Sequence, residues 1–438
     1  MNKRILNAEA VQYVGQQVKL CGWVNTRRDH GSIVFIDLRD ISGLVQVVVK
    51  PELAQDIKPE WVVCLEGLVK ERPERMINPK METGKIEIEA QKLEILSKAK
   101  VLPLHLFEQE VEESTLEKRM NWRWLDLRRP KKQLIFKVWT ALEQSLREYW
   151  LGQGYIEIHS PKFMSSPSES GAELFEVKYF NRKAYLAQSP QFYKQMAMAS
   201  GFEKIFEVGP VFRANPSFTS RHDTEFTGYD AEISFIESHL DVIAAEEEAL
   251  AYALGKIEKK YGKEIEENYG RKLIAPKTPF PQITMADAKK ILAELKVKSE
   301  KEGDLTPEEE RKLSEWILKE RGHEFVFVTE YPKQVRPFYH MRLESDPKLT
   351  KSFDLLWNGL EITTGAQREH RYEILAKQAK EKGLKLEGLK HYLNFFKYGC
   401  PPHGGFGLGP SRMLMKIFNI NNVREVTYIY RGVKRLTP

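Results

Sequence analysis

The chain has 438 residues, of which 42% are hydrophobic and 11% aromatic, as expected for a soluble globular protein with two or three domains. Its 68 basic and 62 acidic residues are interspersed, so the net charge of +6 permits a polyanionic partner without requiring one. No apolar run approaches a membrane span and no cleavable signal is visible, so we expect no membrane partner. Cys21, Cys64 and Cys400 are odd in number and far apart, which predicts neither a disulfide framework nor a zinc site and suits a reducing cytoplasm.

The N-terminal part of the chain contains five short β-prone segments. Each segment is either continuously apolar or alternates apolar and polar residues, and turn residues separate the segments. They cover residues 18–24, 32–38, 43–49, 60–69 and 85–90. This pattern predicts a five-stranded oligonucleotide-binding (OB) barrel over residues 1–104, a fold whose exposed face often binds single-stranded nucleic acid. Candidate contacts on that face are Arg27, Arg28, Phe35, Gln46 and the turn 72–75. The alternative is that Phe35 belongs to the core and the arginines are only solvated.

Residues 105–133 are predicted to be a hinge that leads into a larger domain over residues 134–438. The hinge is rich in arginine, which suits either a charged linker or a contact with an RNA backbone. Apolar residues then recur at helical spacing from 134 to 151, and a strand follows the glycines that end this helix. Mixed-charge helical segments around 240–325 show no chemical signal, and we interpret them as an insertion beside a sheet.

Two polar clusters precede the middle of the chain. The loop 166–175 is rich in small residues, carries Glu169 at its tip and could close over a ligand. Residues 185–195 lead from a strand into a helix and place Gln188, Gln191 and Lys194 around the helix N-terminus. Amide N–H groups and the helix dipole favour carboxylates at such a position.

Residues 206–232 predict a long antiparallel hairpin with a charged loop. Arg213 ends the first strand, Arg221 and His222 lie in the loop, and Phe226 and Asp230 lie on the returning strand. Arginine guanidinium groups neutralise phosphate oxygens, and an aromatic ring can stack on a base. The hairpin therefore suits a nucleotide polyphosphate, although a solvated hairpin with scattered charges is the alternative.

Two carboxylates near residue 360 are candidates for a magnesium site. Asp354 and Glu361 flank a Trp-Asn-Gly turn, so neighbouring strands could present both to one ligand, with Thr364 and Arg368 just downstream. Mg²⁺ prefers such hard oxygen ligands and keeps other positions for phosphate and water. The alternative is a pair of unrelated acids at strand ends.

The last segment with chemical content is the glycine-rich stretch 401–415, which leads from a strand into a helix. It lacks the Gly-Lys-Ser/Thr ending of a P-loop and has the wrong glycine spacing for a dinucleotide motif. Glycine without a side chain, as at Gly409, allows a flat ligand to approach the backbone closely.

Together these segments resemble the class II aminoacyl-tRNA synthetases, in the variant of the archaeal aspartyl enzymes. Residues 134–161 resemble motif 1, residues 206–232 motif 2 and residues 401–415 motif 3, and the barrel resembles the anticodon-binding domain of the aspartyl, asparaginyl and lysyl enzymes. The resemblance implies an α+β protein whose OB barrel precedes an antiparallel-sheet catalytic domain with flanking helices. It also implies a homodimer formed through motif 1.

The resemblance further implies the substrates L-aspartate, ATP and tRNA(Asp), with Mg²⁺ as cofactor. Arg213 and Arg412 would be catalytic. The implied ATP-binding residues are Arg213, Arg221, His222, Phe226, Glu361, Gly409 and Arg412. The implied aspartate-binding residues are Glu169, Gln191, Lys194, Asp230, Thr364 and Arg368. The implied magnesium ligands are Asp354, Glu361 and Thr364.

Charge also bears on which amino acid and which tRNA are used. Lys194 and Arg368 would offer two cations to one side chain, and a neutral asparagine would leave a buried charge unpaired, so we expect aspartate. Enzymes restricted to tRNA(Asp) tend to carry a bulky or basic residue after the Gly-Trp-Val strand, where this chain has Asn25 and Thr26. Charging of both tRNA(Asp) and tRNA(Asn) therefore stays open. The alternatives are an asparaginyl-tRNA synthetase, a tRNA-independent asparagine-synthetase-like paralogue and an RNA-binding regulator.

Overall fold

The computed structural model describes residues 3–106, 114–166, 173–216 and 219–438. The chain divides into two compact units, Met1–Ser114 and Thr115–Pro438, so the boundary falls inside the segment predicted as a hinge. In the described part of the chain, no helix is both long enough and apolar enough to cross a membrane.

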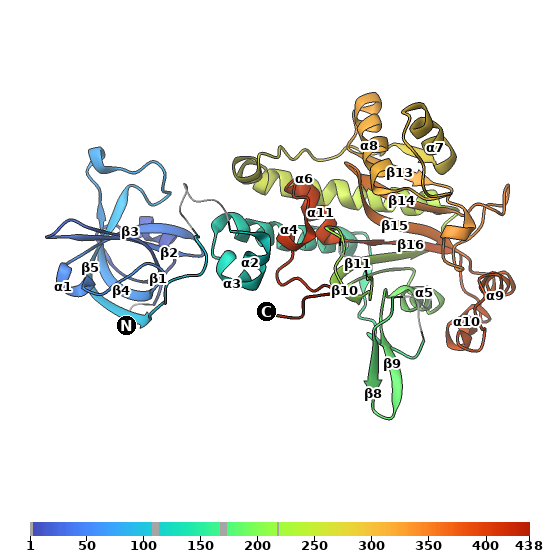
Figure 1. Cartoon of the computed structure of the whole chain (residues 1–438), viewed down its shortest axis with the longest axis horizontal. Coiled ribbons are helices and arrows are strands. Elements are labelled where there is room, and N and C mark those ends of the chain that lie inside the picture. The colour runs from blue at the N-terminus through green and yellow to red at the C-terminus, as the bar shows by residue number, and fades with distance from the viewer. Residues whose placement is uncertain (1–2, 107–113, 167–172, 217–218) are drawn as a thin grey trace. The chain divides into compact units, whose positions relative to one another are not determined.

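The first unit is a closed five-stranded barrel in the order β1-β2-β3-β5-β4, which confirms the predicted OB fold (Figure 1). Its strands are β1 (Gln17–Asp29), β2 (Val34–Asp40), β3 (Gly43–Val49), β4 (Val62–Glu71) and β5 (Ile86–Ser97), and its short helices are η1 (Asn7–Tyr13), α1 (Pro51–Ala54) and η2 (Glu74–Met76). Alternate residues of each strand point inward and form one apolar core, as the period-two pattern requires.

Two of the three cysteines lie side by side in this barrel. Cys21 on β1 is directly opposite Cys64 on β4, and the two form a disulfide, while Cys400 is free and buried. The expectation that no disulfide would form was therefore wrong. The pair is 43 residues apart in sequence, and only the barrel register brings the two strands together.

The second unit contains an eight-stranded sheet in the order β12-β13-β14-β15-β16-β11-β10-β6. All neighbouring strands are antiparallel except at the two edges, where β12–β13 and β10–β6 are parallel. The strands are β6 (Ile156–Glu157), β10 (Lys204–Phe212), β11 (Glu225–Ser234), β12 (Gln282–Thr284), β13 (Phe325–Thr329), β14 (Ser352–Trp357), β15 (Leu360–Arg368) and β16 (His403–Leu408). A small separate sheet contains β7 (Phe163–Met164), β8 (Glu176–Tyr179) and β9 (Arg182–Leu186).

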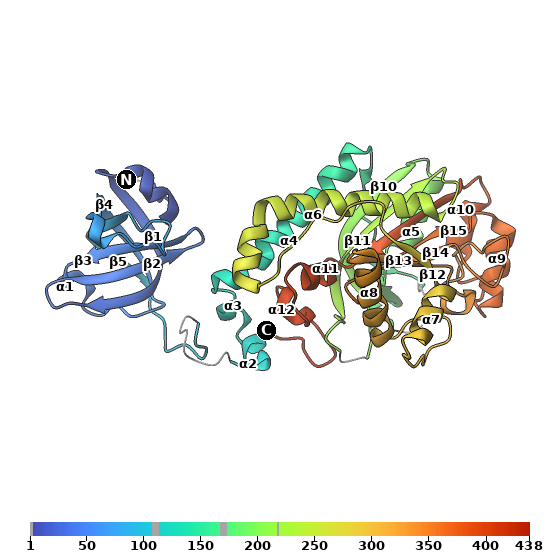
Figure 2. The same ribbon diagram turned by 90° about the horizontal axis from the view of Figure 1, so that it is seen from above.

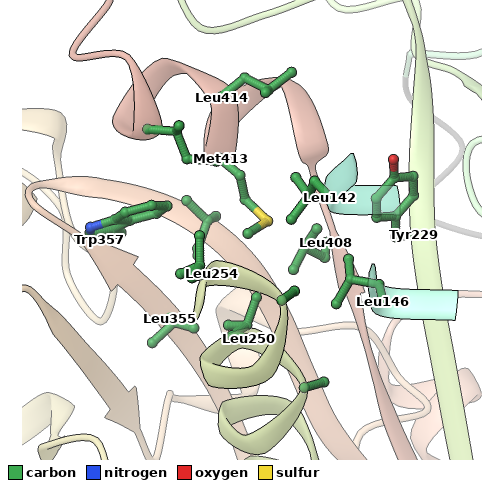
Figure 3. Close-up of a cluster of buried hydrophobic side chains, with 14 of the residues drawn as sticks. Leu142, Leu146, Tyr229, Leu250, Leu254, Leu355, Trp357, Leu408, Met413 and Leu414 are labelled. Carbon is green, nitrogen blue, oxygen red and sulfur yellow. The ribbon is translucent and has the colours of Figure 1, made fainter. Parts of the chain in front are cut away.

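Helices pack on both faces of the large sheet, and Figure 2 shows the two longest of them, α4 (Pro130–Gly152) and α6 (His239–Tyr269), side by side. The helices of this unit are α2 (Leu116–Asn121), α3 (Arg123–Asp126), α4 (Pro130–Gly152), α5 (Gln191–Ala199), α6 (His239–Tyr269), α7 (Met285–Glu294), α8 (Pro307–Arg321), η3 (Lys333–Val335), α9 (Tyr372–Glu381), α10 (Lys390–Phe396), α11 (Pro410–Ile417) and α12 (Val423–Val426). Side chains of α4, α6 and α11 meet Tyr229, Leu408 and Trp357 of the sheet in one buried cluster (Figure 3). Because strand residues alternate between faces, Asp230 beside Tyr229 points to the opposite face.

The segment interpreted as an insertion contains α6, β12, α7 and α8. Ser238 and Asp241 form a capping box at the start of α6, and Gly270 ends this helix with a φ of 66°. Helix α6 packs on α4 and on strands β15 and β16, so its apolar face belongs to the main core. Helix α8 packs against β13, β14 and β15.

The arginine-rich part of the predicted hinge is folded onto the C-terminal end of the chain. Buried Arg123 donates hydrogen bonds to the backbone oxygens of Glu425 and Thr427, at 3.0 and 2.8 Å. Arg119 and Lys132 both pair with the Glu425 carboxylate. In this part of the chain, the three cations have a structural role: they attach helices α2, α3 and α4 to the segment that contains α12.

Candidate active site

A cavity of about 500 Å³ lies on the sheet face opposite α4 and α6. Strands β10, β11, β15 and β16 form its floor. Of the residues predicted for the site, the cavity is lined by Gln191, Lys194, Arg213, Arg221, His222, Phe226, Asp230, Glu361, Thr364, Arg368, Gly409 and Arg412. Glu169 lies outside the described residues. The structure therefore gathers residues from four segments of the chain into one site.

One end of the cavity carries the cations of the β10–β11 hairpin. The hairpin register pairs Val211 with Phe226, and Arg213 follows β10, with its guanidinium 5.5 Å from the Phe226 ring centroid. Burial and the nearby cations Arg412, Arg221 and Arg213 lower the pKa of His222. A neutral imidazole among three arginines makes this end strongly favourable for phosphate oxygens.

Arg221 is held by a residue that the sequence analysis did not identify. Its guanidinium donates to Glu310 of α8 at 2.7 Å and to the Gly359 oxygen at 3.3 Å. Burial raises the pKa of Glu310 to about 7, with Glu361 contributing in the same direction. Helix α8 thus reaches the candidate nucleotide site, although the sequence showed Glu310 only as an acidic residue in the first turn of a helix.

Arg412 lies on α11, directly after the glycine-rich strand β16. It donates to the Glu361 backbone oxygen at 2.8 Å and to the Glu361 carboxylate at 3.2 Å. A Cβ atom on Gly409 would meet nothing closer than 3.8 Å, so no packing requires glycine there, and the backbone stays open to the cavity. A Cβ on Gly405, by contrast, would lie 2.2 Å from Glu232 Oε2. The glycines of β16 thus make room for buried carboxylates as well as for a ligand.

The other end of the cavity contains a buried network of four charges. Lys194 of α5 lies 2.9 Å from Asp230 and 3.3 Å from Glu232, and Arg368 donates to Glu232 at 2.9 Å. The exposed fractions of Lys194, Arg368 and Glu232 are 1%, 2% and 0%. Burial alone would raise the pKa of Glu232, but Arg368 and Lys194 lower it, so this carboxyl is ionised.

This network corrects the charge argument made from the sequence. We expected Lys194 and Arg368 to be two cations awaiting the substrate side chain, but both already have carboxylate partners. Selectivity cannot therefore rest on a simple count of unpaired charges. A carboxylate bound in this cavity would instead have to be met by N–H groups that the network does not use.

Gln191 at the start of α5 offers one such group. Its Nε2 is buried and has no hydrogen-bond partner within the described part of the chain. A buried amide donor without a partner costs free energy, which a ligand oxygen would recover. Gln191 was predicted to contact the amino acid, and its position in the cavity suits that role.

The predicted metal ligands lie on adjacent strands, but one of them has a cationic partner. Asp354 on β14 is opposite Thr364 on β15, and Thr364 Oγ1 lies 3.4 Å from Glu361 Oε1. Asp354 Oδ2 accepts from Arg336 at 2.6 Å, while its Oδ1 is buried without a partner among the described residues. Glu361, Thr364 and Asp354 Oδ1 fit the hard oxygen set that Mg²⁺ takes together with phosphates.

Arg336 and His340 were also missed from the sequence. Both line the cavity, on the segment between η3 and β14. Arg336 stacks 3.6 Å from the ring centroid of Tyr331, and His340 contacts Arg368 at 3.1 Å. The available signal was a cation and an imidazole set among aromatic residues in Arg336-Pro-Phe-Tyr-His340.

On the barrel, the strand register decides which anticodon candidates share a face. Arg28 is opposite Phe35, and Phe35 is half-buried against His30 rather than in the barrel core. Gln46 lies on the same face through its pairing with Asp37. Arg27 is opposite the core residue Ile36, so the expectation that it shares this face was wrong, because neighbouring residues of a strand alternate.

Comparison with known proteins agrees with this architecture. The family described as "tRNA synthetases class II (D, K and N)" matches residues 115–430, and the "OB-fold nucleic acid binding domain" matches residues 18–96. The protein belongs to this class II aminoacyl-tRNA synthetase family.

Relatives of nearly the same length show where in the family the chain lies. It is 42% identical over 435 residues to an aspartate–tRNA(Asp/Asn) ligase of Aeropyrum pernix, covering 97% of this chain and 96% of the relative. It is 41% identical over 432 residues to an aspartate–tRNA(Asp) ligase of Pyrococcus abyssi, covering 97% of each. The crystal structure of asparaginyl-tRNA synthetase from Pyrococcus horikoshii complexed with asparaginyl-adenylate superposes with a TM-score of 0.91 at 32% identity and covers 100% of both chains.

Proposed function

We infer that this protein is an aspartate–tRNA ligase, which activates L-aspartate with ATP and transfers it to tRNA. The observation that supports this most strongly is a cavity that has arginines at one end and the Lys194–Asp230–Glu232–Arg368 network at the other. Full-length relatives with this activity support the same conclusion. The cavity fits a nucleotide polyphosphate and a small zwitterion with an acidic side chain, placed side by side on one sheet.

We propose that the first step needs no nucleophile from the protein. The α-carboxylate of aspartate attacks the α-phosphorus of ATP, a P–O bond forms, and the bond to pyrophosphate breaks. Arg213 neutralises the α-phosphate, while Arg221, His222 and Arg412 take the pyrophosphate oxygens and Phe226 stacks on adenine. Asp230 accepts from the substrate ammonium. The terminal ribose hydroxyl of tRNA then attacks the carbonyl carbon of the adenylate, and AMP leaves.

Magnesium is proposed at Glu361, Thr364 and the free oxygen of Asp354. When bound, the ion would neutralise charge on the triphosphate and orient it for displacement. Arg336 already compensates the second Asp354 oxygen, so Glu361 and Thr364 would hold the ion together with only one oxygen of Asp354. Arg412, in contact with Glu361, links this group to the pyrophosphate end.

The choice of tRNA is proposed to be relaxed, so that both tRNA(Asp) and tRNA(Asn) are aspartylated. Neither Asn25 nor Thr26 is bulky or basic, and Thr26 and Asn25 instead bond to Asp37 and Arg39 within the barrel. A single base difference is worth about 1–3 kcal/mol, which a few side chains decide. The relatives with about 40% identity include enzymes of both kinds.

Charging purified transcripts of both tRNAs with labelled aspartate tests the activity and its tRNA range together. We expect aspartyl-tRNA from both transcripts, with rates within about tenfold of each other, corresponding to about 1.4 kcal/mol. A preference above about a hundredfold for tRNA(Asp) would contradict relaxed charging but not the ligase. Ammonia-dependent asparagine synthesis without tRNA, or charging with asparagine alone, would contradict the ligase itself.

A homodimer through motif 1 is also proposed. Strand β6 is an edge of the large sheet. The exposed fractions of two apolar side chains of motif 1, Leu151 of α4 and Ile156 of β6, are 57% and 46%. We expect light scattering to give twice the chain mass of 51.0 kDa, and Ile156→Asp to give the single mass, because a buried unpaired carboxylate opposes association. A wild-type mass of 51.0 kDa at micromolar concentration would contradict the dimer.

A further inference from the structure

The guanidinium of Arg368 is fixed on three sides by partners from different elements. Nε donates to Glu232 of β11 at 2.9 Å, and Nη2 donates to the Gly405 oxygen of β16 at 2.8 Å. Nη1 lies 3.1 Å from Nε2 of His340. A planar guanidinium held at all three nitrogens has a single orientation, which sets where its remaining Nη1 N–H points.

The chemistry of the third contact defines the state of His340. Arginine has no acceptor, so Nη1 is the donor and the imidazole Nε2 must be the acceptor, with the ring proton on Nδ1. Burial, together with Arg368, Arg336 and Lys194, lowers the pKa of His340 well below its usual value. The ring is therefore neutral near neutral pH, and its lone pair stays available to Arg368.

The backbone around His340 is held by strand β15 and helix α9. His340 and Arg368 form an antiparallel bridge, and Met341 N donates to the Gln367 oxygen at 3.0 Å. The Gln378 amide donates to the Phe338 and His340 oxygens at 2.7 and 3.2 Å. The exposed fraction of His340 is 3%, so water does not compete for the contact with Arg368.

We propose that His340 is a positioning residue for amino-acid recognition, whose Nε2 accepts from Arg368 and orients it so that the second Nη1 N–H meets the substrate side-chain carboxylate. This inference rests on the proposed function of the cavity. The charges of Lys194, Asp230, Glu232 and Arg368 balance one another and so do not by themselves select aspartate over asparagine. The orientation of Arg368 would provide this selectivity. Because His340 contacts Arg368 and not the nucleotide end, it acts on aspartate and not on ATP.

The test is ATP–pyrophosphate exchange in His340→Leu and His340→Gln, with KM measured separately for aspartate and ATP. Leucine removes the acceptor at similar volume, and we expect its KM for aspartate to rise about tenfold to a hundredfold, the range for a lost hydrogen bond to a charged group. Glutamine can place an oxygen near the Nε2 position, so we expect rescue to within about threefold of wild type. KM for ATP should change by less than about twofold in both variants.

A matched control is His239→Leu, which removes another buried, neutral histidine outside the cavity. We expect its KM for aspartate to match wild type. Should His340→Leu not fold, His340→Asn replaces it, because its polar side chain is too short to reach Arg368. Equal effects of leucine and glutamine, or an equal rise in KM for ATP, would overturn the inference. Wild-type enzyme without aspartate-dependent exchange would overturn the proposed function and this inference together, whereas normal exchange with an unchanged leucine variant would overturn this inference alone.

Discussion

Replacement of Arg213 with alanine is expected to lower ATP–pyrophosphate exchange by about a thousandfold while the protein stays folded. Arg213 follows β10 at the cation-rich end of the cavity, where negative charge on the α-phosphate grows as the carboxylate attacks. Its side chain makes a weak contact of 3.5 Å to the Gln188 oxygen and stacks near Phe226. Because these contacts contribute little to packing, the loss should fall on catalysis rather than on stability.

Circular dichroism and light scattering would show whether the Arg213→Ala variant keeps its structure and oligomeric state. Arg213→Lys keeps the charge but not the planar fork, so we expect a partial loss. Arg182→Ala is a matched control, since Arg182 lies on β9 and stacks on Tyr179 outside the cavity. Exchange by Arg213→Ala close to the wild-type rate would refute the assignment of Arg213 to the phosphate.

Replacement of Lys194 with methionine is expected to lower aspartate-dependent exchange by about a hundredfold or more. Lys194 is buried between Asp230 and Glu232 and also donates to the Phe406 oxygen at 3.1 Å. Its removal leaves the carboxylates of Asp230 and Glu232 without the cation that they share, and this excess of negative charge beside the bound amino acid would weaken the binding of aspartate. Loss of one partner of a buried ion pair costs about 3–5 kcal/mol, so the melting temperature should fall as well.

A double substitution separates recognition from stability in this network. Lys194→Met with Asp230→Asn removes one charge of each sign, so we expect the melting temperature to recover while aspartate activation does not. Lys162→Met is the control, because Lys162 pairs with buried Glu207 away from the cavity. If the Lys194→Met variant discriminates aspartate from asparagine as the wild type does, Lys194 is not part of amino-acid recognition.

Local sequence patterns predicted the secondary structure of both units well. The five barrel strands, the 134–151 helix and the 206–232 hairpin follow from hydrophobic periodicity and turn residues, which act over a few residues. Helices and strands that depend on neighbouring residues can be predicted without knowing what they pack against. The order of strands in the sheet, and the disulfide between Cys21 and Cys64, depend on contacts between distant segments and were not visible in this way.

In the candidate site, too, short motifs were predicted and contacts between distant segments were not. Most of its predicted residues line the cavity, because the motifs that carry them are short and specific. The hydrogen-bond partners of those residues were missed. Glu310 contacts Arg221, Arg336 contacts Asp354, and both Glu232 and His340 contact Arg368. Glu310, Arg336 and His340 come from segments to which the sequence analysis assigned no function, whereas Glu232 lies at the end of the predicted hairpin but was not assigned to the site.

The sequence by itself predicted the fold class, the two-part organisation, the family and most of the residues that line the cavity. Only the tertiary structure decided how the charges of those residues are balanced. Electrostatic energies fall with distance and rise with burial, so they depend on which side chains meet in a low-dielectric site. Lys194 and Arg368 looked like free cations in the sequence, and the folded chain shows each already held by a buried carboxylate.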